Sequence, residues 1–336
     1  MPPSPENNDL SAVQQAADQH ADEILGRRRE GRAKRTAALA AHPQPLSIRT
    51  EFTKAPTGAP IAGAVAPAPT STTSQTAGYL LAVGDSWFDY PIHDILTRLD
   101  DNYGYNIESS AHRGDPIETM VSSVGQLDKF ARCMDKIVAL GAAPKAILIS
   151  GGGDDIAGTE FGMLINNADL QPIPGWNDQI IAGVIDTRIA AAYRMMILSV
   201  NSLCQKDLGR TFPILVHGYD YPVPDGRGFL GGGWILPGPW LKPGFDEKLF
   251  TDLNATTQMM MTVIDRFNAM LQNLVKEPDS GNVNYIDLRG TLSNKLTDYQ
   301  QWWANEIHPN AGGIFGGQDG WGAVAAKFEA VLATLP

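Results

Sequence analysis

Residues Leu80–Tyr90, which read LLAVGDSWFDY, decide how the rest of the chain is interpreted. The apolar run Leu80–Val83 has the length of a buried strand, and Gly84 interrupts it. An apolar-periodic segment, Ile92–Leu99, follows, which is the pattern of a strand, a tight turn and a helix. Ser86 then stands at the carboxyl end of a strand, where open α/β sheets place their chemistry. It is either a candidate nucleophile or the cap of the following helix.

The remainder of the chain alternates between strand and helix patterns. Apolar strand candidates lie at residues 79–83, 105–109, 146–150, 212–216 and 283–288. Helical candidates lie near residues 92–101, 116–140, 178–208, 247–276 and 320–334. Strands that are separated by helical crossovers form a parallel sheet with helices on both faces. The sequence therefore predicts an α/β fold, a three-layer α/β/α sandwich with about five parallel strands.

The first 77 residues have a different composition. Residues 10–41 are predicted to form one polar helix with a thin apolar stripe. Its basic cluster, Arg27–Arg29, is interpreted as a solvated face rather than a membrane contact. Residues 55–76 are mostly Pro, Ala, Gly, Thr and Ser, the composition of an extended linker. We therefore expect a polar helical extension at 1–54, a Pro/Ala/Thr-rich linker at 55–77 and the main domain at 78–336.

Composition and charge narrow the possible partners. The chain has 336 residues and a net charge of −11, which argues against a nucleic-acid surface. Cys133 and Cys204 lie in helical patterns and are expected to be buried free thiols, and no Cys/His spacing suggests a metal site. No membrane span is expected, and the amino terminus lacks the pattern of a secretory signal. We expect a cytoplasmic location, with signal-independent export left open.

The segment 222–245 departs from the alternating pattern, because glycines and prolines are interleaved with aromatic residues. A loop of this length is uncommon inside a compact domain unless it serves a site. Trp234 and Trp240 could supply the apolar surface of a lid or an acyl-binding wall. The alternative is a long surface excursion whose aromatic side chains attach it to the body of the domain.

Three further stretches favour Ser86 as a nucleophile. After the second strand candidate, Gly114 could present a bare backbone N–H to the site. The third strand candidate is followed by Gly151–Ile156, which contains two adjacent aspartates. Near the carboxyl terminus, His308 lies in a loop just before the last predicted helix.

Together these blocks resemble the SGNH, or GDSL, family of serine esterases and lipases. Gly84–Ser86 matches its first block, Gly114 its second, Gly152–Asp155 its third and Asn305–His308 its fifth, and His217–Pro222 is also similar. The resemblance covers residues 78–335 and implies the flavodoxin-like fold of that family. It implies a carboxylic ester hydrolase with a small-molecule or lipid ester as substrate, no metal and no organic cofactor.

The resemblance also implies roles for particular residues. Ser86 would attack the ester carbonyl, and His308 would accept its proton and return it to the departing alcohol. The backbone N–H groups of Ser86 and Gly114 and the side chain of Asp154 would form the oxyanion hole. Apart from the resemblance, His112 precedes Gly114 closely enough to line the pocket. The alternatives are a carbohydrate deacetylase or acetyltransferase of the same fold, and a non-catalytic binding protein with a disabled site.

Two positions depart from the family pattern, and they mirror each other. Asp154 stands where the family has Asn, and Asn305 stands where it has Asp. Our hypothesis is that burial and the neighbouring Asp155 keep Asp154 protonated, so that its O–H donates to the oxyanion. Glu306 is the nearest substitute for the missing acid beside His308. The alternatives are that Glu306 is a solvated loop residue, and that a Ser-His dyad is held by a backbone or amide oxygen.

Overall fold

The computed structural model describes residues 5–41, 76–122, 124–158, 160–170, 172–231, 236–313 and 316–336. The described residues up to Leu25 form one compact unit with Thr76–Pro336, whereas the first helix from Gly26 onward belongs to a second unit. Most of the predicted linker, residues 55–75, lies outside the described residues, as do residues 42–54. The expected division at residues 54 and 77 stays a prediction.

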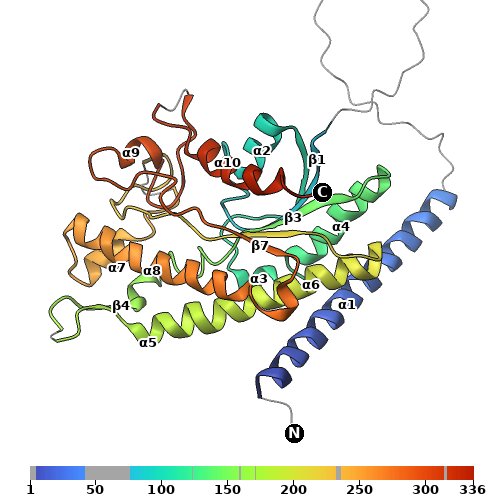
Figure 1. Ribbon diagram of the computed structural model, residues 1–336, viewed down its shortest axis with the longest axis horizontal. Helices are drawn as coiled ribbons and strands as arrows, with labels where there is room; N and C mark the ends of the chain where they lie inside the picture. The colour runs from blue at the N-terminus through green and yellow to red at the C-terminus, as the bar shows by residue number, and fades with distance from the viewer. Residues whose placement is uncertain are drawn as a thin grey trace, which may run out of the picture. The chain divides into compact units, whose positions relative to one another are not determined.

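The main unit is built on a sheet of five parallel strands in the order β2-β1-β3-β6-β7 (Figure 1). The strands are β1 (Gly78–Val83), β2 (Tyr105–Ser109), β3 (Pro144–Ile149), β6 (Ile214–His217) and β7 (Val283–Ile286). The three inner strands, β1, β3 and β6, are mostly buried and apolar, as expected for a sheet that is covered on both faces, whereas the edge strands β2 and β7 are partly exposed. The predicted fold class is confirmed, and the strand ends differ from the predicted ones by no more than two residues.

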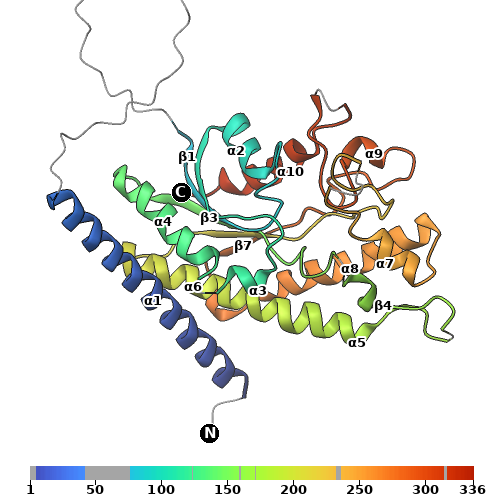
Figure 2. The ribbon, with the colours of Figure 1, turned by 180° about the vertical axis from the view of Figure 1, so that it is seen from behind.

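Helices cover both faces of this sheet. On one face lie α2 (Ile95–Tyr103) and α10 (Gly320–Leu332), which pack against each other. The other face is covered by α4 (Gln126–Ala139), α6 (Ala190–Leu208) and α8 (Leu253–Leu274), and the view from behind shows the same two layers (Figure 2). The remaining elements are α1 (Pro5–Ala41), α3 (Ile117–Met120), η1 (Phe161–Leu164), β4 (Ile165–Asn166), β5 (Gly175–Trp176), α5 (Asp178–Ile181), η2 (Ala182–Ile189), η3 (Phe229–Gly231), α7 (Lys242–Glu247), η4 (Pro278–Ser280) and α9 (Tyr299–Trp302).

The sequence patterns missed some local detail. The helix predicted at 116–140 is divided into α3 and α4, and the one predicted at 247–276 begins six residues later, at Leu253. The short antiparallel pair of β4 and β5 was not predicted, because strands of two residues carry no periodic signal.

The first part of α1 packs against α6 through the thin apolar stripe. Ala17, Ala21 and Ile24 are fully buried. Beside them, the Ser202 hydroxyl donates a hydrogen bond of 2.6 Å to Asp18. The helix therefore gains its stability from tertiary contacts that its own weak amphipathicity could not supply.

Two expectations from composition can be compared with the structure. Cys133 and Cys204 are both buried thiols and neither is part of a disulfide, which confirms the prediction for them. In the described ranges, no helix combines the length and the apolar character needed to cross a membrane.

Candidate active site

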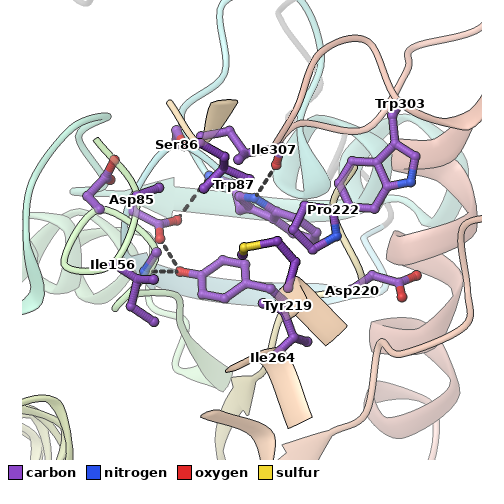
Figure 3. Close-up of a pocket in the computed structure, with 15 residues that line it drawn as sticks. Asp85, Ser86, Trp87, Ile156, Tyr219, Asp220, Pro222, Ile264, Trp303 and Ile307 are labelled. Carbon is purple, nitrogen blue, oxygen red and sulfur yellow. Dashed lines mark hydrogen bonds between the residues drawn. The ribbon is translucent and has the colours of Figure 1, made fainter. Parts of the chain in front are cut away.

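Asp85 links the carboxyl ends of β1, β3 and β6 by hydrogen bonds beside Ser86 (Figure 3). Its carboxylate is buried and accepts a hydrogen bond of 2.6 Å from the Ser150 hydroxyl, which follows β3. It also accepts a hydrogen bond from the hydroxyl of Tyr219, which follows β6. The Tyr219 oxygen in turn accepts from the backbone N–H of Gly153, at 3.0 Å. Because the strands are parallel, these ends meet at one edge of the sheet, and Asp85 holds the Ser86 turn there.

Gly84 is required where the chain turns from β1 towards Ser86. A Cβ atom at this position would lie 2.8 Å from the Phe88 ring and 2.9 Å from Ser150 Cβ, closer than side chains can approach. The backbone of Gly84 is also held by the buried side chain of Gln126, which accepts from its N–H and donates to its carbonyl, both at 2.9 Å. The turn that presents Ser86 is therefore fixed by close packing and by hydrogen bonds.

Ser86 and His308 meet although they lie 222 residues apart in the chain. Ser86 Oγ is 2.7 Å from His308 Nε2. Burial lowers the pKa of His308 to about 3, so its imidazole is neutral at neutral pH and can accept a proton. The following helix, α2, is capped by Asp94, so the interpretation of Ser86 as a helix cap is wrong.

Asn305 holds the other nitrogen of the His308 ring. Its Oδ1 lies 3.1 Å from His308 Nδ1 and also accepts the backbone N–H groups of Ile307 and His308, at 3.1 Å and 2.9 Å. Two N–H donors on this oxygen fix the orientation of the amide, since the flipped amide would face them with its own N–H₂. His308 Nδ1 therefore carries the proton, and Nε2 is left as the acceptor for Ser86. The arrangement is a Ser-His pair held by an amide oxygen.

Glu306 is fully buried, so its interpretation as a solvated loop residue is wrong. Its Oε1 accepts the N–H groups of Gly226 and Lys242, at 2.9 Å and 3.0 Å. Its Oε2 accepts those of Trp240 and Leu241, at 2.6 Å and 2.8 Å. The structure does not bring this carboxylate to His308. Glu306 instead clamps the two ends of the long loop onto the histidine segment.

Asp154 lines the same cavity as Ser86 and lies next to the backbone N–H of Gly114. Burial, followed by the negative charge of Asp85, raises the pKa of Asp154 to about 8, and the Gly114 N–H acts in the opposite direction. Asp154 Oδ2 is buried and has no hydrogen-bond partner in the described part of the chain. Gly114 has a positive φ of 81°, a conformation that favours glycine. Asp154 is thus protonated at neutral pH, with one oxygen left available.

A small cavity of about 50 Å³ opens beside Ser86 and Asp154. Its other walls are mainly apolar and aromatic, as Figure 3 shows. They include Trp87, Ile156, Tyr219, Pro222, Leu241, Met260, Ile264, Trp303 and Ile307. Such a lining suits an apolar group next to the Ser86 hydroxyl.

Of the three residues predicted to contact substrate, Trp240, His112 and Trp234, only Trp240 is seen at the site within the described part of the chain. Trp240 packs its ring edge-to-face on His308, with the ring centroids 5.4 Å apart. His112 is not among the residues that line the cavity: its side chain is 58% exposed and lies 3.1 Å from the Asp115 carboxylate. Trp234 lies outside the described residues. The loop 222–245 therefore contributes to the wall of the site through Pro222 and Leu241 and through the contact of Trp240 with His308.

Several residues at the site were not singled out from the sequence. Tyr219 joins Asp85 to Gly153, and Met260 and Ile264 come from α8, whose apolar pattern shows only that one face is buried. Tyr219 belongs to the block His217–Pro222 that resembles the family, so a signal for it was present. Within the described ranges, no cluster of His, Cys, Asp or Glu side chains is arranged to hold a metal ion.

The chain matches no family model and no curated protein. Among solved structures it is similar to Axe2, an acetylxylan esterase from Geobacillus stearothermophilus, with 12% identity over 77% of this chain and 95% of that one and a TM-score of 0.38. It is also similar to LAE5, an alpha/beta hydrolase from the metagenome of Lake Arreo, with 12% identity over 78% and 97% of the two chains and a TM-score of 0.37. A third is the catalytic domain of the peptidoglycan O-acetyltransferase OatA from Streptococcus pneumoniae, with 10% identity over 78% and 98% and a TM-score of 0.35. These TM-scores add no argument to the sheet and the site, which stand on this chain's own residues.

Proposed function

We propose that this chain is a serine hydrolase of the SGNH/GDSL type that cleaves carboxylic esters of short acyl groups through an acyl-Ser86 intermediate. The observation that carries the proposal is the distance of 2.7 Å between Ser86 Oγ and a buried His308 Nε2 whose other nitrogen is held by Asn305. A serine hydroxyl needs a base within hydrogen-bond reach, and this base is itself oriented by a third group.

The proposed reaction has two halves. As Ser86 Oγ bonds to the carbonyl carbon, its proton passes to His308 Nε2, and the carbonyl oxygen becomes an oxyanion. The N–H groups of Ser86 and Gly114 and the O–H of Asp154 stabilise that charge. The ester C–O bond then breaks, and His308 returns the proton to the departing alcohol. Water repeats these steps on the acyl-enzyme, which releases the carboxylic acid and restores Ser86.

The volume of the cavity limits the length of the acyl group that fits beside Ser86. The cavity is small, about 50 Å³, and has mainly apolar walls, so a short acyl group suits it better than a long chain. The walls carry few polar groups apart from Asp154 and the Ser86 turn. We therefore propose acetyl to butyryl esters as the preferred substrates.

A serine-directed fluorophosphonate tests the proposal. We expect one adduct by intact mass, located on the peptide that contains Ser86, together with hydrolysis of p-nitrophenyl acetate and butyrate and a steep fall in rate for octanoate. Prior incubation with a short-chain ester should slow the labelling. No adduct, or an adduct on another serine, would contradict the proposal.

Asp154 gives the proposal a distinctive pH dependence. Its raised pKa of about 8 means that the O–H is present below this pH and is lost above it, when a negative charge faces the forming oxyanion. We expect kcat/KM of the wild type to fall as the pH rises through about 8. In Asp154→Asn the amide donates at every pH, so the ratio of variant to wild-type kcat/KM should rise about tenfold between pH 7 and 9.

A neighbouring variant gives a control with a defined direction. The charge of Asp155 helps to raise the pKa of Asp154. Asp155→Asn should therefore keep the alkaline fall in kcat/KM and move it to lower pH. Profiles of wild type and Asp154→Asn that coincide from pH 5 to 9.5 would show that residue 154 does not donate to the oxyanion.

A further inference from the structure

We infer that Tyr90 is a positioning residue of this site, which holds the Asn305 amide and the His308 ring in the arrangement that a carboxylate would otherwise enforce by charge. The inference rests on the proposed function and deepens it. In this inference, four neutral side chains are joined in series by hydrogen bonds: Ser86, His308, Asn305 and Tyr90.

The first observation is a hydrogen bond behind the histidine. Asn305 Nδ2 donates to the Tyr90 hydroxyl at 3.0 Å, while Asn305 Oδ1 faces His308 Nδ1. Asn305 is 1% exposed, so solvent has little access to this N–H if the phenol is removed. Burial raises the pKa of Tyr90 to about 12, so the phenol stays neutral throughout the working range.

The second observation is the packing of the Tyr90 ring on the imidazole. The centroids of the Tyr90 and His308 rings are 4.4 Å apart with an angle of 33° between the planes. Trp240 contacts the same imidazole edge-to-face, at 5.4 Å. The two aromatic side chains therefore limit rotation of the His308 ring while Nε2 faces Ser86.

A neutral site needs this support more than a charged one. Hydrogen bonds to an ionised partner are roughly twice as strong as those between neutral groups. The amide of Asn305 has only the weaker kind to offer His308 Nδ1–H, and an amide that shifts or flips would favour the Nε2–H tautomer, which cannot accept from Ser86. Two backbone N–H groups hold Oδ1 from one side, and Tyr90 adds to their effect by accepting from Nδ2 on the other.

The position of Tyr90 in the chain supports the same role. It lies four residues after Ser86, in the segment that joins β1 to α2. This segment therefore carries both the nucleophile, Ser86, and Tyr90, which holds Asn305 behind the base His308.

The test compares Tyr90→Phe, which removes only the hydroxyl, with Tyr221→Phe. The latter removes a phenol whose bond of 2.8 Å goes to Asp265 at an exposed position. We expect Tyr90→Phe to lower kcat for p-nitrophenyl butyrate about tenfold, with KM changed less than twofold, because one buried donor loses its partner. Tyr221→Phe should change neither constant, and the melting temperatures of all three proteins are compared.

A spectroscopic readout separates positioning from a general structural effect. In protein labelled with ¹⁵N-histidine, the shifts of the two ring nitrogens report which one carries the proton. We expect His308, assigned by its loss in His308→Ala, to be Nδ1-protonated in the wild type, and to show a mixture of tautomers in Tyr90→Phe. Unchanged kcat and an unchanged tautomer in Tyr90→Phe would overturn the inference. A wild-type His308 protonated on Nε2 would also overturn it, and this result is read from the wild-type spectrum alone.

The two proposals fail in different ways. If the wild type neither labels with the phosphonate nor hydrolyses esters, the proposed function fails, while the nitrogen shifts still test the Tyr90 contact. If Ser86 labels and esters are cleaved, but Tyr90→Phe matches the wild type in both readouts, only the role of Tyr90 is lost.

Discussion

Ser86→Ala is expected to lower kcat for ester hydrolysis by at least about 10⁴-fold, and His308→Ala by a similar factor. Ser86 Oγ and His308 Nε2 lie 2.7 Å apart and act on one proton, so neither group is useful without the other. The double variant should therefore be no slower than either single variant. What activity remains comes from binding and from the oxyanion donors, which both substitutions leave in place.

Steady-state rates with p-nitrophenyl butyrate, corrected for the uncatalysed reaction, measure these effects. Ser109→Ala is the matched control, because it removes a serine hydroxyl at the end of β2, on the same edge of the sheet. It should leave kcat within about twofold. Losses that multiply in the double variant would show that the two side chains act independently, which the proposed mechanism does not allow.

Glu306→Ala is expected to destabilise the protein by about 3–5 kcal/mol, because each buried N–H that loses its acceptor costs about 1–3 kcal/mol and water can satisfy part of the set of four. Glu306→Gln keeps the shape but replaces one oxygen by an N–H₂ group that faces two donors, so it should also be destabilising. In Glu306→Ala the backbone N–H groups of Trp240 and Leu241 lose their acceptor, so ester hydrolysis should fall as well.

Urea denaturation and thermal melting measure the stability, and kcat is measured well below the melting temperature. Glu247→Ala removes a glutamate whose side chain is 69% exposed, in α7, and serves as the control with little expected effect. If Glu306 were the acid of a triad, Glu306→Gln would lose activity and keep its stability. Wild-type stability of Glu306→Ala would rule out the clamp.

Asn305 and Glu306 show a choice that local sequence could not decide, namely which of the two side chains faces His308. Both stand within three residues of His308, and the choice between them depends on the path of the backbone between residues 305 and 308. In the structure, Asn305 Oδ1 turns back onto the N–H groups of Ile307 and His308, which places it at Nδ1. The adjacent Glu306 side chain leaves in another direction, towards the long loop.

The hypothesis for Asp154 depended on burial and neighbouring charge, and both are seen around it. Desolvation by burial raises its pKa most, and the charges of Asp85, Asp155 and Asp115 add to the rise. Asp155 is the next residue in the chain, whereas Asp85 is near Asp154 because β1 and β3 are adjacent strands. The role of Asp154 at the oxyanion stays a proposal for the pH profile to test.

The sequence by itself determined the α/β layering, the order of strands and helices, and the positions of Ser86, Gly114, Asp154 and His308 at the ends of these elements. Those features follow from hydrophobic periodicity and from glycines at turns, which are local properties of the chain. Only the tertiary structure decided that Asn305 rather than Glu306 faces His308, that Glu306 clamps a loop, and that Tyr90 lies against the imidazole. The directions of these side chains depend on how distant segments pack, and the spacing of Asn305 and Glu306 before His308 left the choice between them open.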